Sequence, residues 1–163
     1  MPDVIPGLLQ TEPYARAVLT ACIAVTGGRD DLEEALAARM QRQRVLQHGN
    51  HRFHMVIGEW ALYRTVGDNT VMLGQLDRLS EATNHPRIRF GILPLTAEYR
   101  LPATNFVIYD RTQVLAETVS AELTITRPSE IALHEKTFAT LAEQPAYGDG
   151  ARAVIAAAAE RRR

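Results

Sequence analysis

The chain has 163 residues, of which 46% are hydrophobic, and this length fits one domain that buries roughly two-thirds of its unfolded surface. Its 18 basic and 19 acidic side chains nearly balance, and the one concentrated basic block, Arg161 to Arg163, does not form a DNA-binding stripe. Cys22 is the single cysteine and no apolar run approaches the roughly 18 residues of a membrane span, which excludes an internal disulfide and favours a cytoplasmic protein.

The first fifty residues are predicted to form two helices. Pro6-Gly7 bends the chain, and Thr11 then caps a helix over residues 12–25 that ends at Gly27-Gly28. Cys22 is expected to be a small buried residue of that helix. The second helix, over residues 30–47, begins at the capping pair Asp30 and Glu33. The expected buried positions of the two helices recur at helical spacing: Tyr14, Ala17, Val18 and Ala21, then Leu32, Ala35, Leu36 and Met40.

The remaining elements alternate between strand and helix periods. A strand over residues 52–57 leads into a short turn through Trp60 that closes at Gly67, and a helix containing Met72, Leu73, Leu76 and Leu79 follows. Further strands are predicted over residues 88–93, 105–109, 113–119 and 123–126, with the middle two forming a hairpin. Helices beginning at Pro128 and at Gly150 complete the chain. These elements predict an α+β or α/β fold in which a small mixed sheet packs with about five helices, as one domain over residues 1–163.

The opening run Val4 to Ala17 (VIPGLLQTEPYARA) resembles the start of a domain of unknown function that follows Xre-type helix-turn-helix regulators in actinobacteria. Eight further segments follow in the family's order: Arg39 to Leu46, Met55 to Glu59, Leu62 to Arg64, Val66-Gly67, Gln75 to Leu79, Gly91 to Leu95, Asn105 to Ile108 and Val114 to Glu117. Two stretches depart from the pattern. Tyr63 stands where a second arginine is usual, and Glu98 to Arg100 replace a small, glycine-rich stretch.

The resemblance implies a sensor or interaction domain that modulates an upstream DNA-binding domain. In such regulators a helix-turn-helix domain precedes the Pro-Gly-Leu-Leu motif, so the chain is either the C-terminal part of a regulator or a stand-alone relative without DNA binding. A neighbouring gene often encodes a short protein in an antitoxin-like arrangement. The expected partners are therefore a small-molecule ligand or a small partner protein, with DNA contacted only through the upstream domain. The apolar residues Val4, Ile5, Leu8 and Leu9 further suggest a homodimer.

Candidate chemistry is sparse. The spacing of His51 and His54 does not suit a metal site on a strand, and these residues, with His48, are read as solvated loop histidines; neither a metal nor a cofactor is expected. Polar residues at predicted strand ends could line a ligand pocket with Trp60 as an apolar wall: Glu59, Trp60, Arg64, Glu98, Tyr99, Arg100, Asn105 and Glu117.

Two other interpretations of these residues stay open. Glu59 and Arg64 could form a structural ion pair beside a solvated loop of Glu98 to Arg100. Alternatively, Glu59 and Glu117 could perform acid–base chemistry if they are close, so a stand-alone enzyme or carrier for a small metabolite in the same pocket is the second hypothesis.

Overall fold

The computed structural model describes residues 4–27, 31–101, 105–118 and 121–163. Within these ranges it contains five α-helices, three short 3-10 helices and two three-stranded sheets, which confirms the α+β class and divides the expected single sheet into two. Three expected features fall outside the described residues: the second glycine of the helix stop, Gly28, the cap Asp30 and the strand end Val119.

The N-terminal part is helical, as expected. The 3-10 helix η1 (Gly7–Leu9) leads into α1 (Glu12–Thr26), which Thr11 caps by accepting a hydrogen bond from the Tyr14 amide over 3.4 Å. Gly27 ends α1 in the left-handed conformation, with φ of 64°. The second helix is shorter than predicted, because α2 (Leu32–Arg42) tightens into the 3-10 helix η2 (Gln43–Leu46).

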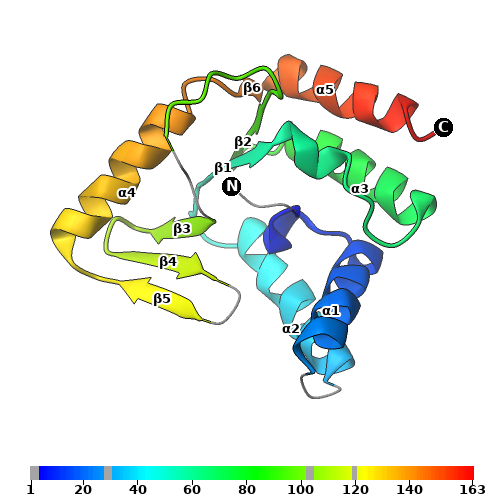
Figure 1. The fold of residues 1–163 in the computed structure, drawn as a ribbon, viewed down its shortest axis with the longest axis horizontal. Coiled ribbons are helices and arrows are strands. Elements are labelled where there is room, and N and C mark those ends of the chain that lie inside the picture. The colour runs from blue at the N-terminus through cyan, green and yellow to red at the C-terminus, as the bar shows by residue number, and fades with distance from the viewer. Residues whose placement is uncertain (1–3, 28–30, 102–104, 119–120) are drawn as a thin grey trace.

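The buried face of α1 differs from the expected one. Tyr14 and Ala15 are buried, whereas Ala21 and Cys22 are exposed, so the prediction of a buried cysteine is wrong. Figure 1 shows that the α1–α2 hairpin extends away from the rest of the molecule, and among the described residues of α1 only Tyr14 and Val18 belong to the main core or pack against it. An apolar period in the sequence cannot show that a helix runs past its core.

The first sheet, sheet A, contains β1 (Phe53–Gly58), β2 (Ile88–Leu93) and β6 (Ala146–Tyr147) in the order β1-β2-β6. β1 and β2 are parallel and β6 is antiparallel to β2. The 3-10 helix η3 (Glu59–Leu62) and α3 (Asn69–Ala82) connect the parallel pair, and α5 (Gly148–Glu160) packs on α3, β2 and β6. Asp68 caps α3 by accepting from the Val71 amide over 2.9 Å.

The second sheet, sheet B, is an antiparallel meander of β3 (Phe106–Tyr109), β4 (Gln113–Glu117) and β5 (Glu122–Ile125). α4 (Pro128–Leu141) packs on β3 and β4, and Figure 1 shows this sheet and α4 together on one side of the molecule. Val114 and Ala116 on the sheet and Ile131 on the helix are buried. Sheet B and α4 therefore form a lobe whose residues lie between β2 and β6 in the sequence, although β2 and β6 are hydrogen-bonded neighbours in sheet A.

The main hydrophobic core lies around sheet A and the N-terminal segment. Its buried members come from η1, α1, η2, β1, η3, α3, β2 and α5, and among them Leu9, Tyr14, Leu62, Leu79 and Ile92 are almost fully inaccessible. Ile5 and Leu9, whose apolar character suggested a homodimer, pack inside this core. Val4 and Leu8 are half-buried, and the homodimer stays a prediction. In the described ranges, none of the helices combines the length and the apolar character that crossing a membrane requires.

Candidate functional site

Glu59 directly follows β1 and forms a hydrogen bond with the segment that follows β2. Its Oε2 accepts a hydrogen bond from the Leu95 amide over 2.9 Å, and its Oε1 accepts one from the Tyr63 hydroxyl over 3.1 Å. Burial, and then the bond to Glu59, raises the pKa of Tyr63. The two carboxylate oxygens of Glu59 thus fasten the loop after β2 to the helix after β1.

Trp60 and Arg64 are one turn apart after β1, since the Arg64 amide donates to the Trp60 carbonyl over 3.2 Å. Trp60 is half-buried and its ring covers Gly58, where an added Cβ would come within 2.2 Å of the indole. Arg64 is exposed. Burial raises the pKa of Tyr14, and the bond to the Ile5 backbone and the charges of Arg64 and Arg162 only partly oppose this rise. Trp60 therefore completes the packing of sheet A, and Arg64 belongs to the charged surface around it.

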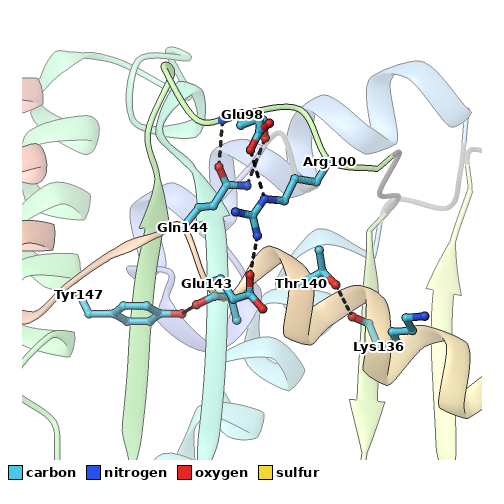
Figure 2. A network of polar contacts seen from close by, with 8 residues as sticks. Glu98, Arg100, Lys136, Thr140, Glu143, Gln144 and Tyr147 are labelled. Carbon is cyan, nitrogen blue, oxygen red and sulfur yellow. Dashed lines mark hydrogen bonds and ion pairs between the residues drawn. The ribbon is translucent and has the colours of Figure 1, made fainter.

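The loop after β2 is fastened at its other end to the C-terminus of α4, as Figure 2 shows. The Glu98 amide donates to Gln144 Oε1 over 2.9 Å and its carbonyl accepts from Gln144 Nε2 over 3.1 Å. Arg100 pairs with Glu143 over 2.5 Å and with Glu98 over 3.6 Å, whereas Tyr99 is 79% exposed. The loop is therefore exposed, and it also connects the end of sheet A to the residues that follow α4.

Asn105 and Glu117 belong to sheet B rather than to the junction at sheet A. Phe106 pairs with Ala116 in the antiparallel register, which puts Asn105 opposite Glu117 at the end of the hairpin. Glu117 acts electrostatically on Arg39 of α2, whose pKa is lowered chiefly by burial. The eight predicted pocket residues are therefore distributed over three places: the strand ends of sheet A, the bridging loop and the end of sheet B.

The structure also assembles an aromatic and basic cluster at the contact between sheet A and α4 that the sequence did not indicate. His54 on β1 bonds through Nε2 to the Tyr147 hydroxyl over 2.9 Å, and its ring meets Phe138 edge-on at 4.8 Å. The Arg89 guanidinium lies 4.5 Å from the centre of the Tyr147 ring. Burial, and then Arg89, lowers the pKa of His54. His54 is thus not a solvated loop histidine.

A basic region begins within α2 and continues to the end of β1. Residues 35–58 contain four arginines and three histidines but none of the chain's 19 acidic residues. Part of it lines a shallow, open depression of about 440 Å³ formed by Arg44, Val45, His48, Gly49 and His51. A second depression, of about 420 Å³, lies between α4 and sheet B beside Arg111 and Glu135. Neither depression is lined by any of the eight predicted residues, and the absence of acidic residues was a sequence signal that could have located the first.

Three glutamine side chains hold the N-terminal segment against the core. Buried Gln75 accepts from the Thr11 amide over 2.7 Å and donates to the Leu9 carbonyl over 2.8 Å. Gln43 donates to the carbonyls of Gly7 and Gln10, each over 2.8 Å.

Gln10 extends the same arrangement. It donates to the Ile5 carbonyl over 2.8 Å and accepts from Arg39 over 3.0 Å. We call Gln10, Gln43 and Gln75 the glutamine clasp. It joins three of the segments that carried the family resemblance: the opening motif, the segment Arg39 to Leu46, and the segment Gln75 to Leu79.

Comparison with known proteins gives a family without an assigned activity. In the described residues no group of three or more His, Cys, Asp or Glu side chains is placed to hold a metal ion. No curated protein and no solved structure matches the chain. One family profile matches residues 1–157, which is nearly the whole sequence. The chain therefore belongs to the family described as a domain of unknown function, DUF5753.

Proposed function

We propose that this domain is the non-enzymatic regulatory part of a cytoplasmic, actinobacterial transcriptional regulator of the Xre type. It binds a small molecule or a small partner protein and passes that state to a DNA-binding domain on its N-terminal side. The observation that supports the proposal best is the glutamine clasp. The clasp bonds the N-terminal segment to two different helices of the present domain. In the proposed regulator, that segment connects to the DNA-binding domain.

The clasp supplies a physical route for coupling. The N-terminal segment is bonded to Gln43 just after α2 and to Gln75 on α3. A change in the position of α2 relative to α3 therefore has to move or break hydrogen bonds to residues 7–11. Binding of an effector would shift the population between two such arrangements in proportion to its differential affinity for them.

The test uses the full gene product with its upstream DNA-binding region and the short protein encoded by the neighbouring gene. DNA binding is measured by fluorescence anisotropy with a labelled promoter fragment. We expect the short protein to change the promoter affinity of the full product by about 5- to 150-fold, the usual range of allosteric coupling. The isolated domain should show no sequence-dependent binding to the same fragment.

Two variants separate coupling from binding. Gln43→Ala removes two hydrogen bonds of the clasp and should preserve promoter binding while reducing the effect of the short protein. Gln47→Ala, an exposed glutamine four residues further on, should behave as the unmodified protein. The proposal fails if the short protein binds the regulator without changing its DNA affinity, or if the isolated domain binds the promoter specifically.

A further inference from the structure

The basic region after α2 has a feature that the regulatory proposal does not use: its positive charge is not neutralised. Arg44 and Arg52 are exposed, and the backbone of Arg87 lies next to the residue after Arg52, because its carbonyl accepts a hydrogen bond from the Phe53 amide over 2.8 Å. Within the part of the chain that the structure describes, none of these three arginines forms an ion pair. Seven other arginines of the described chain do pair with acidic side chains.

We define the basic corner as Arg44, Val45, His48, Gly49, His51, Arg52 and Arg87. The first five line the depression of about 440 Å³. Its lining surface is mainly apolar, although three of the five lining residues, Arg44, His48 and His51, are basic. Gly49 has φ of 73°, and a Cβ there would lie 3.2 Å from the His51 ring, so the bare backbone keeps the depression open.

Charge in the molecule is distributed unevenly around this corner. The chain as a whole has a net charge of −1, yet residues 35–58 carry four arginines with no acidic residue. Arg87 adds a guanidinium whose buried Nη1 lacks a hydrogen-bond partner in the described structure. Guanidinium groups bind carboxylates through parallel hydrogen bonds, and an apolar centre with a charged margin is the usual composition of a protein-binding surface.

From these observations we propose that the basic corner binds an acidic segment of a partner protein. Carboxylates of that segment face Arg44, Arg52 and Arg87, and an aliphatic side chain occupies the surface of Val45 and Gly49. A nucleic-acid backbone would satisfy the charge but leave the apolar part of the depression unused. The inference rests on the proposed function and deepens it by naming the chemistry of the partner. Because its test uses the isolated domain, the inference can fail while regulation through another surface stands.

The test is a titration of the 163-residue chain with a short fluorescein-labelled peptide of alternating glutamate and leucine, followed by anisotropy. We expect saturable binding that weakens between about 50 mM and about 300 mM salt, because the attraction between exposed charges is screened. A peptide with glutamine in place of glutamate should bind at least about tenfold more weakly, which corresponds to roughly 1.4 kcal/mol. Equal binding of the two peptides would overturn the proposal.

Charge reversals locate the site. Arg44→Glu and Arg52→Glu should each weaken the acidic peptide by about tenfold or more, since each replaces an attractive contact with a repulsive one. Arg42→Glu, an exposed arginine outside the depression, is the matched control and should have a much smaller effect. If all three reversals weaken binding equally, the attraction is diffuse and no docking site exists. If duplex DNA of arbitrary sequence binds more tightly and displaces the peptide, the corner is a nucleic-acid contact and the proposal is wrong.

Discussion

The side-chain amide of Gln75 accepts a hydrogen bond from the backbone amide of Thr11 over 2.7 Å, although the two residues are 64 positions apart. Gln75 is one of two polar residues among the described ones that are buried, and its other end donates to the Leu9 carbonyl. Both of its polar groups are therefore satisfied by the backbone of the N-terminal segment. A glutamine within an apolar helical face acts here as a specific connector between α3 and the start of the chain.

The first prediction concerns this connector. Gln75→Leu preserves the approximate volume but leaves the Thr11 amide and the Leu9 carbonyl without partners in the core. We expect the free energy of unfolding to fall by about 2 to 5 kcal/mol, because each buried unsatisfied group costs about 1 to 3 kcal/mol. Urea denaturation measures the change, with Gln47→Leu as an exposed control. A loss no larger than that of the control would show that the clasp is not a stabilising connection.

The second prediction compares two glycines. At Gly91 on β2 a Cβ would lie 2.5 Å from the Tyr147 ring and 2.9 Å from Pro145, whereas at Gly74 on α3 nothing lies within 4 Å. Gly91→Ala should lower the free energy of unfolding by about 1 to 3 kcal/mol through overpacking. Gly74→Ala should raise it by roughly 0.5 to 1 kcal/mol, because alanine favours a helix interior. Changes of the same sign in the two variants would contradict the packing of β6 on β2.

The third prediction is a pH dependence. Burial and Arg89 lower the pKa of His54, so the folded state favours the neutral imidazole more strongly than the unfolded chain does. The contribution of His54 to stability is therefore complete above its ordinary pKa of about 6.5 and is lost as pH falls through its lower folded pKa.

The measurement is the free energy of unfolding at about pH 7.5 and about pH 5.5, a range in which histidine titrates. Arg89 and Tyr147 face His54, and Phe138 packs against its ring. His54→Gln can still bond to Tyr147 but carries no titrating charge, so it should reduce the loss of stability on acidification. An unchanged pH dependence in this variant would show that other groups account for it.

The fourth prediction follows from the exposure of Cys22. Because Cys22 is exposed, a maleimide should label it fully in the native protein without denaturant. Labelling should leave the urea midpoint nearly unchanged, since the surrounding core does not contain the thiol. Cys22→Ala serves as the unreactive control. Protection of the native thiol that disappears in urea would show that another surface covers this part of α1.

The fifth prediction tests the pocket proposed around Trp60. An anionic ligand that binds beside Glu59 and Arg64 should change the fluorescence of Trp60, which is the single tryptophan of the chain. Arg64→Ala should then weaken that ligand by about 1.5 to 3 kcal/mol through loss of a charged hydrogen bond. Inorganic phosphate and acetate are suitable first probes. An unchanged affinity in Arg64→Ala would leave Trp60 as a packing residue over Gly58 and remove the basis for this pocket.

Some local features were predictable because they depend on neighbouring residues. Thr11 caps α1, Gly27 ends it, and Met72, Leu76 and Leu79 form the buried face of α3, as the helical period predicted. Pro128 begins α4 for the same local reason: its missing amide and fixed φ suit the first helical turn. The fold class followed from the order of these elements.

The arrangement of the candidate residues was not predictable in the same way. The Glu59 carboxylate bonds to Tyr63 and to the Leu95 amide, and the second of these partners lies 36 positions away in the sequence. The loop containing Glu98 and Arg100 is exposed, but its partners Glu143 and Gln144 follow α4 and lie more than forty positions away in the sequence. Hydrogen bonds between residues that are distant in the sequence produce no periodicity or spacing, so a single sequence does not reveal them.

By itself the sequence determined the elements, the α+β class and the single cysteine, since each depends on residue type and short-range order. It also carried the resemblance to a domain of unknown function, which the family match supports. Only the tertiary structure decided that the strands divide into two sheets and that three glutamines clasp the opening motif. It also decided that the second half of α1 extends beyond the core and that, among the described residues, Arg44, Arg52 and Arg87 form no ion pair. The physical reason is that burial, pairing and charge neutralisation depend on which distant segments meet, and that is set by the packing of whole elements rather than by any stretch of the chain.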